Sequence, residues 1–223
     1  MKVEKLISKI TKISDIPIVL HTMDSYSSYW DNWYILFKKY VKNHGPIYFL
    51  TEEKAPSFVD EVIHIKTGSD EWGYRLLNGL SQIDSDLIFY IQEDFWAIKD
   101  ITLEDTFLEL FKQYEMNCLK ICLNSDLISL HSVTDVLYKY NQHSEYTLSH
   151  QFALWDRKYF MDNIHPFETP WANEIYGSQR INETNHKIYY IDNYWYEPVC
   201  RHGVLQPIGY DILKTHNLEF YGK

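Results

Sequence analysis

The sequence is poor in cysteine, has no excess of basic residues and contains no long apolar run. It has three cysteines in 223 residues, and their odd number and spacing match no zinc or redox motif: Cys118, Cys122 and Cys200. No stretch reaches the roughly eighteen apolar residues of a membrane-spanning helix, and residues 1–12 lack the apolar centre of a signal peptide. We therefore expect reduced thiols and a cytoplasmic location, with peripheral association with a membrane still open.

The charge balance and the missing motifs exclude several classes of function. The chain has 21 Lys and Arg against 31 Asp and Glu, a formal net charge of −10, which disfavours non-specific binding to nucleic acid. It contains no GxxxxGK or GxGxxG loop, no HExxH helix and no GxSxG elbow. The histidines His143, His150 and His165 are not at metal-ligand spacing. A P-loop enzyme, a zinc enzyme and a serine hydrolase are therefore not indicated.

Aromatic residues are the abundant feature, at 17% of the chain with 19 Tyr and 7 Trp. Flat rings with polar edges suit sugar rings and nucleobases, although they also suit cores and protein interfaces. The hydrophobic fraction of 45% and the charged fraction of 23% are typical of a globular protein with a packed core. The length favours one substantial domain over two small ones.

Apolar periodicity predicts strands that alternate with helices over residues 15–115. The predicted strands are residues 16–21, 47–51, 61–66 and 86–92, and the predicted helices are residues 29–41, 70–83 and 102–114. Such alternation is typical of an α/β fold with a mostly parallel sheet, and the apolar run 86–92 reads as a central strand. Thr102 is the predicted cap of the third helix.

The second half of the chain is less regular, and residues 124–146 are too polar for a clear assignment. The predicted strands there are residues 118–123, 149–155, 187–191 and 196–199. A short helix is predicted over residues 156–163. Another begins at Thr169 and Pro170, because proline at the first helical position loses no hydrogen bond.

Two adjacent acids, Glu93 and Asp94, follow the predicted central strand. Ligands of parallel sheets bind at the carboxyl ends of the strands, where these acids lie. Carboxylates can there hold Mg²⁺ or Mn²⁺ shared with substrate phosphates. The alternative is that both acids cap the following turn. The next helix already has a predicted cap in Thr102, so the two acids are not needed for capping, and this favours the metal site.

The stretch LLNGLSQIDSDLIFYIQEDF, residues 76–95, resembles nucleotide-sugar-dependent glycosyltransferases of the GT-A fold, in which this strand ends in a DxD-type motif. The triplet here is QED, with Gln92 at the first position. The segment HTMDSYSSYWDNWYILFKKY resembles the opening strand and nucleotide loop of small bacterial and viral members, and ALWDRKYF with TPWANE resembles their acceptor side. The resemblance touches residues 16–202.

The resemblance implies a GT-A-like, Rossmann-like domain over residues 1–223, with a mostly parallel central sheet flanked by helices. Residues 1 to about 123 would bind the nucleotide sugar and residues from about 124 to 223 the acceptor. It further implies an enzyme that transfers a sugar from a nucleoside-diphosphate sugar to a hydroxyl of a glycan, such as a polysaccharide, lipopolysaccharide or glycoprotein glycan. Mn²⁺ or Mg²⁺ would be the cofactor, and the transfer would invert the sugar configuration.

The resemblance also assigns roles around the diphosphate. Asp94 and His202 would bind the metal, and Glu93 would contact ribose or a metal-bound water. The residues expected to contact the nucleotide and its phosphates are Thr22, Asp24, Tyr26, Arg75, Asn78 and Arg201. The plainer alternative for His202, Arg75 and Asn78 is an ordinary surface or core side chain.

On the acceptor side, Glu174 matches the general base of inverting members. A base needs hydrogen-bond reach to the hydroxyl and an ionised carboxylate. Its alternative role is to complement the dipole of its helix. Trp171, Trp155 and Trp96 are the expected sugar contacts, and a core position is the alternative for Trp171.

Two other functions stay open at the level of sequence. A nucleotidyltransferase also uses carboxylate-bound metal on a parallel sheet, although the chain lacks a glycine- and lysine-rich phosphate loop near its N-terminus. A non-catalytic carbohydrate-binding module of glycosyltransferase type would use the aromatic residues alone. Metal-dependent binding of a nucleoside diphosphate would separate an enzyme from such a module.

Overall fold

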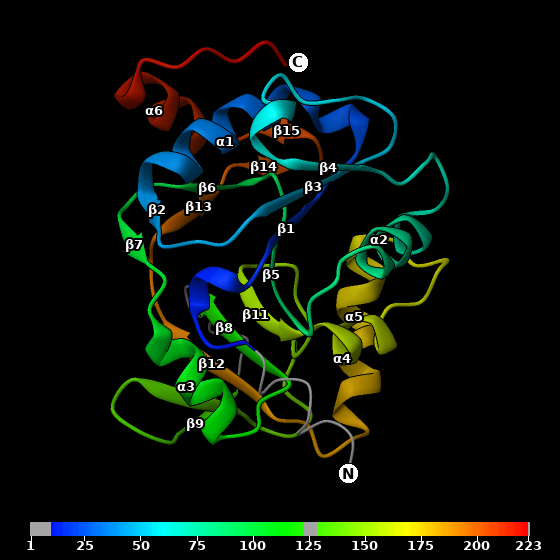
Figure 1. The fold of residues 1–223 in the computed structure, drawn as a ribbon, viewed down its shortest axis with the longest axis vertical. Helices are drawn as coiled ribbons and strands as arrows, with labels where there is room; N and C mark the ends of the chain where they lie inside the picture. The colour runs from blue at the N-terminus through cyan, green and yellow to red at the C-terminus, as the bar shows by residue number, and fades with distance from the viewer. Residues whose placement is uncertain (1–9, 123–128, 223) are drawn as a thin grey trace.

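The computed structural model describes residues 10–122 and 129–222, which form a nine-stranded sheet with helices packed around it (Figure 1). In spatial order the strands of the sheet are β4 (Ile63–Lys66), β3 (Ile47–Thr51), β1 (Ile18–His21), β5 (Leu87–Ile91), β11 (Ala153–Asp156), β8 (Cys118–Cys122), β12 (Ile188–Asp192), β10 (Leu137–Tyr140) and β9 (Leu130–Ser132). Strands from both predicted halves of the chain share this sheet.

Most strands of the sheet run in one direction. The pairs β4–β3, β3–β1, β1–β5 and β8–β12 are parallel, whereas β11 is antiparallel to both β5 and β8, and β10 is antiparallel to both β12 and β9. Only β11 and β10 therefore run against the others within the described sheet. The predicted α/β fold with a mostly parallel central sheet is confirmed.

Helices cover the sheet and join its strands. They are α1 (Ser27–Tyr40), α2 (Trp72–Ser81), α3 (Asp105–Gln113), α4 (Arg157–Asp162), α5 (Pro170–Asn182) and α6 (Pro207–His216), with single 3₁₀ turns η2 (Ile13–Asp15), η3 (Asp24–Tyr26) and η4 (Val59–Glu61). Helix α2 contacts both α4 and α5, and these three lie together at the right of Figure 1. Helices α1 and α6 lie at the upper left. No helix among the described residues is long and apolar enough to cross a membrane.

Three small two-stranded sheets lie outside the nine-stranded sheet. They pair β13 (Tyr196–Pro198) with β6 (Phe95–Ala97), β14 (Cys200–Arg201) with β15 (Val204–Leu205), and β2 (Val41–Lys42) with β7 (Ile101–Thr102). The β13–β6 pair joins residues 196–198 to the segment directly after Asp94. Two segments a hundred residues apart are thereby fixed beside the carboxyl end of β5.

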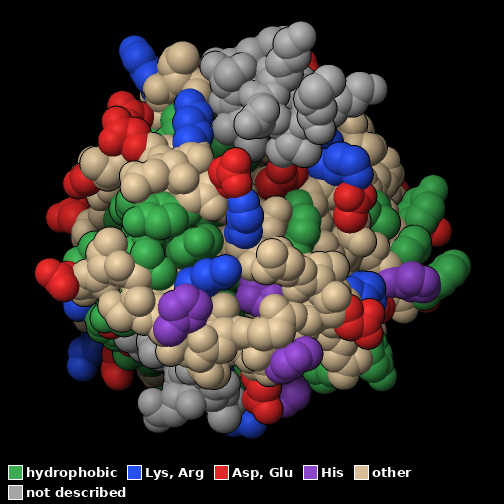
Figure 2. Space-filling view, turned by 90° about the horizontal axis from the view of Figure 1, so that it is seen from below, with side chains coloured by type: hydrophobic (Ala, Val, Ile, Leu, Met, Phe, Trp, Pro, Cys, Tyr) green, Lys and Arg blue, Asp and Glu red, His purple; other side chains and the backbone are tan. Residues whose placement is uncertain are grey.

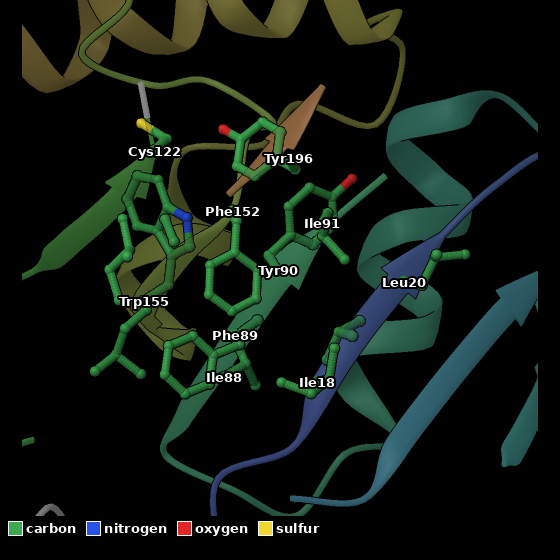
Figure 3. Packing of buried hydrophobic residues seen from close by; sticks show 14 of the residues in the cluster. Ile18, Leu20, Ile88, Phe89, Tyr90, Ile91, Cys122, Phe152, Trp155 and Tyr196 are labelled. Carbon is green, nitrogen blue, oxygen red and sulfur yellow. The ribbon is translucent and has the colours of Figure 1, made fainter. Parts of the chain in front are cut away.

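The core lies along β5 and β11. All five residues of β5 are buried, as expected for a strand covered on both faces. Phe89 stacks on Phe152 with ring centroids 5.0 Å apart (Figure 3). Trp155 stacks on Phe160 with ring centroids 4.8 Å apart. The first contact packs the start of β11 against β5, and the second packs β11 against α4.

Several local predictions differ from the structure. Thr102 ends β7, and α3 instead begins after Glu104 without a side-chain cap, so the predicted cap is wrong. The strand predicted over 149–155 begins only at Ala153. The strand predicted over 118–123 is β8, and its last residue, Leu123, lies outside the described residues. No prediction was made for helix α6 or for strands β9, β10, β14 and β15. The four strands have only two to four residues each, too few to show a clear periodicity.

Lys and Arg side chains are interspersed with Asp and Glu on the face of the molecule that Figure 2 displays. The mixture on the visible part agrees with the acidic composition of the chain.

Candidate active site

A cavity of about 330 Å³ lies at the carboxyl ends of β1 and β5, between the first turn of α5 and the β14–β15 hairpin. This is the edge at which parallel sheets bind ligands. The predicted site residues that line it are Thr22, Tyr26, Glu93, Asp94, Trp171, Glu174, Arg201 and His202. Residues from four separate parts of the sequence therefore meet in one place.

The two acids after β5 form the floor of this cavity together with Gln92. Their turn is fixed from both sides, because Phe95 N–H donates to the Gln92 carbonyl and Val199 N–H donates to the Asp94 carbonyl at 2.8 Å. Burial raises the pKa of both carboxyl groups, and for Glu93 the neighbouring charge of Asp94 raises it further. Two crowded carboxylates of this kind favour a bound cation.

Asp94 offers the better metal ligand of the pair. Its Oδ1 is buried and has no hydrogen-bond partner within the part of the chain that the structure describes. The same residues contain no group of three or more His, Cys, Asp or Glu side chains close enough to hold a metal by themselves. Because Mg²⁺ commonly takes one or two carboxylates and completes its shell with water and substrate phosphates, these residues fit a shared metal.

Glu174 lies in the first turns of α5, whose start follows the predicted signals. Thr169 Oγ accepts from Ala172 N–H, and Pro170 occupies the first helical position. The carboxylate of Glu174 accepts the backbone N–H of His150 at Oε1, 2.9 Å away. Burial raises the pKa of Glu174, while this hydrogen bond and the charge of Lys120 oppose the rise. The carboxylate is thus partly desolvated and held in one orientation.

Arg201 and His202 lie at the tip of the β14–β15 hairpin. The hairpin turns at His202 and Gly203, which both have positive φ, +52° and +77°, as a two-residue hairpin turn requires. Tyr29 Oη donates to the Gly203 carbonyl at 3.3 Å, and the His202 ring lies 6.0 Å from the Trp171 ring. Both hairpin residues are exposed, so the turn presents a cation and an imidazole to the cavity.

The predicted nucleotide loop follows β1 and divides into lining and bracing residues. Thr22 lines the cavity and accepts from Trp30 Nε1–H at 3.0 Å. Asp24 does not line it, because its Oδ2 accepts the backbone N–H groups of Glu53 and Lys54. In this position Asp24 fixes the loop, and its contact with the nucleotide stays a prediction.

Arg75 and Asn78 also lie outside the cavity lining. Arg75 is 1% exposed, donates to the Thr22 carbonyl at 3.2 Å and lies 3.8 Å from Glu52. Asn78 donates to the Thr67 carbonyl. Both side chains bond within the protein, and Arg75 holds the loop that carries Thr22. Their contact with diphosphate or base stays a prediction that the cavity lining does not support.

Two of the three predicted tryptophan contacts are core residues. Trp155 is fully buried on β11, as Figure 3 shows, and Trp96 is fully buried beside Tyr29. Neither lines the cavity, because β11 is covered on both faces and β6 packs under α1. Trp171, at 56% exposure, is the member that faces the cavity.

The structure adds His21, Trp72 and His150 to the cavity. His21 ends β1 at the same edge as the acids, so its position in the strand could have revealed it. His150 had no usable signal, because it lies in a segment predicted to be strand and reaches the cavity through the pairing of β11 with β5 and β8.

Lys120 is a further residue that sequence reasoning missed. It is 1% exposed on β8, and its ammonium donates to the Tyr146 carbonyl and to Ser149 Oγ, the latter at 3.1 Å. Burial lowers its pKa. The segment that carries His150 is thus anchored at one end by Lys120 and at the other by Glu174.

Comparisons with known proteins bear on the fold. No protein-family model matches the sequence, and no curated protein matches it. The structure of S. aureus TarS 1–349 in complex with UDP-GlcNAc is similar with a TM-score of 0.56 at 12% identity, covering 90% of this chain and 65% of that one. TarS 1–349 without a named ligand gives a TM-score of 0.53 at 14% identity and covers 82% and 59%. The chain thus spans less than two thirds of these TarS structures.

UDP-glucose pyrophosphorylase complexed with UDP-glucose is similar over nearly its whole length. Its TM-score is 0.57 at 8% identity, and the match covers 91% of this chain and 98% of that one. Identities this low establish the fold alone. The chain therefore has a GT-A-like α/β fold, with its cavity at the carboxyl edge of the parallel strands.

Proposed function

We propose that the protein is a metal-dependent glycosyltransferase that moves a sugar from a uridine-diphosphate sugar to a hydroxyl of a glycan acceptor. One observation carries the proposal: a single cavity in a GT-A-like fold joins the acids after β5 to Glu174 at the start of α5. The UDP and UDP-GlcNAc complexes of TarS support the choice of donor class. Polysaccharide, lipopolysaccharide and glycoprotein glycans are the acceptor classes considered.

In this proposal each residue has a separate task. Glu174 takes the proton of the acceptor hydroxyl as its oxygen bonds to the anomeric carbon. The bond from that carbon to the diphosphate breaks on the opposite face, and UDP leaves with the bonding pair, so the configuration inverts. Arg201 stabilises the diphosphate by its charge, and Asp94, with His202, would hold Mn²⁺ or Mg²⁺. The metal supplies charge neutralisation at the leaving group when bound.

Replacement of the base gives the direct test. Glu174→Gln keeps an oxygen that can accept the His150 N–H but cannot take a proton, so turnover should fall about a hundredfold or more while UDP affinity stays the same. Turnover would be measured as the release of UDP from UDP-sugars in the presence of Mn²⁺ and a panel of glycan acceptors. Normal turnover in this variant would remove Glu174 from the mechanism, and retention of configuration in the product would remove the inverting assignment.

A nucleotidyltransferase is the second candidate, favoured by the near-complete coverage of UDP-glucose pyrophosphorylase. Such an enzyme would form UTP from UDP-glucose and pyrophosphate, which a glycosyltransferase cannot do. Incubation with both compounds and Mg²⁺ decides between the two functions by the appearance of UTP. A non-catalytic carbohydrate-binding module would show neither turnover nor metal-dependent binding of UDP. The cytoplasmic location, with or without contact to a membrane, stays a prediction that cell fractionation would check.

A further inference from the structure

Two buried histidines in the cavity lining have ring nitrogens without a well-formed hydrogen bond to the described residues. His21 is fully buried and His150 is 2% exposed, and both side chains line the cavity. None of their four ring nitrogens has a hydrogen bond of good distance and angle among those residues, although the Pro170 carbonyl lies near the His150 ring. Because buried polar atoms in folded proteins nearly always have a partner, these nitrogens point to a ligand that supplies one.

An aromatic side chain lies between the two imidazoles. The Trp72 ring is 5.5 Å from the His21 ring and 4.8 Å from the His150 ring, and it also lines the cavity. Tyr90 lies behind, with its ring 5.6 Å from that of His150 and its buried hydroxyl unpartnered in the described part of the chain. One surface therefore combines a flat apolar ring with several free polar atoms.

The two imidazoles are neutral at physiological pH. Burial lowers the pKa of His150 to about 3, and burial lowers the pKa of His21 well below its ordinary value. A neutral imidazole offers one donor and one acceptor, which a hydroxyl can match because it too donates and accepts. A carboxylate would match only the donor.

We propose that His21, Trp72 and His150 form the subsite for the sugar ring of the donor, and that this subsite selects neutral hexoses over uronic acids. The proposal rests on the proposed function and specifies its substrate class. The sugar would stack on Trp72 and exchange hydrogen bonds with both imidazoles. Three carboxylates, Glu93, Asp94 and Glu174, line the same cavity, and Arg201 on the exposed hairpin is the one Arg or Lys among its described lining residues. Arg201 and the proposed divalent cation do no more than balance these three acids, so the cavity has no surplus positive charge to bind a uronate.

Isothermal titration calorimetry in MnCl₂ tests the proposal with UDP, UDP-glucose and UDP-glucuronic acid. The wild-type protein should bind UDP-glucose at least about tenfold more tightly than UDP-glucuronic acid, the usual effect of unmatched buried polar groups. His21→Phe and His150→Phe keep a flat ring and remove both nitrogens. Each should weaken UDP-glucose about tenfold and change UDP affinity less than twofold.

His186→Phe is the matched control, because His186 is also buried with two unpartnered ring nitrogens within the described residues but lies outside the cavity lining. It should alter neither affinity. Equal binding of the two sugars by the wild-type protein overturns the proposal even if a variant fails to fold. The subsite is also overturned if both variants fold and keep the wild-type ratio of UDP-glucose affinity to UDP affinity. In either case, binding of UDP by the wild-type protein leaves the proposed function standing. Absence of UDP binding would overturn both.

Discussion

At the scale of single residues, this protein places acids and a lysine where burial makes charge costly. Asp94 and Glu93 follow a fully buried strand, and Lys120 lies inside the sheet at 1% exposure. The lysine is compensated by the Tyr146 carbonyl and Ser149. The acids have less compensation from the described residues, since Asp94 Oδ1 is unpartnered among them. The charge of Lys120 is therefore used within the fold, whereas the carboxylate of Asp94 is available to a ligand.

Asp94→Asn should weaken Mn²⁺-dependent UDP binding at least about tenfold, because the amide cannot supply the charge that a cation needs. The fold should tolerate the change, since burial already raises the pKa of the carboxyl group that is replaced. Calorimetry with and without Mn²⁺ measures the effect. Asp192→Asn is the control, because Asp192 also ends a strand of the sheet, β12, but accepts from Tyr190 Oη outside the cavity. Equal UDP affinity in wild type and Asp94→Asn would rule out the metal site.

Lys120→Met should move the acidic limb of the pH–rate profile to higher pH. Burial raises the pKa of Glu174, while the His150 N–H and the Lys120 charge lower it. Loss of the lysine therefore raises the Glu174 pKa, and a higher pH is then needed to ionise the base. The pH dependence of kcat measures this shift. Lys139→Met, on β10, should leave the profile in place, and an identical profile for both variants would contradict the role of Lys120.

At the scale of elements, helix α5 carries three lining residues of the cavity, Pro170, Trp171 and Glu174. Its start is encoded locally, because Thr169 caps it and Pro170 fixes the first turn. By contrast the β14–β15 hairpin is encoded by only four strand residues and a turn with two positive φ angles. The helix provides the more rigid wall, and the hairpin depends on its contact with Tyr29.

Thr169→Ala should lower the free energy of unfolding by about 1 kcal/mol, because the Ala172 N–H loses its acceptor. Urea denaturation at pH 7 measures this loss. Thr215→Ala serves as the control, since Thr215 lies exposed in α6 and donates only to the Asp211 carbonyl of its own helix. A loss no larger than that of the control would show that the cap contributes nothing.

At the scale of the whole molecule, one sheet joins the two predicted halves of the chain. Strand β8 lies between β11 and β12, and β11 lies between β5 and β8, so sequence-distant strands alternate in space. Their side chains pack into one buried core cluster. Stability is therefore shared across the sheet, and buried groups far from the cavity contribute to it.

His186, directly before β12, makes part of that stability depend on pH. Burial lowers its pKa, the charges of Lys139, Lys120 and His143 add to this effect, and the resulting pKa is about 4. Histidine in an unfolded chain has a pKa of about 6.5. Between pH 6.5 and about 4 the unfolded chain therefore binds a proton that the folded chain does not, so the free energy of unfolding falls as the pH falls.

His186→Gln removes this titration. The free energy of unfolding of wild type minus that of the variant should be largest above pH 6.5 and shrink as the pH falls to 4.5. Urea denaturation across this range provides the values. If this difference instead stays constant from pH 7 to 4.5, His186 takes up no proton on unfolding.

The sequence by itself determined the features that depend on neighbours along the chain. The apolar run of β5 gave a buried strand with Glu93 and Asp94 at its end, and Thr169 with Pro170 gave the start of α5. Periodicity and capping act over a few residues, so they can be read directly.

Only the tertiary structure decided which side chains face the cavity. Trp155 became core because the antiparallel strand β11 is covered on both faces, and Arg75 became a brace because Glu52 and the Thr22 carbonyl lie beside it. His150 entered the cavity because β11 pairs with β5, some sixty residues earlier in the chain. Such pairings depend on the free energy of packing the whole core, and no local pattern of residues specifies them.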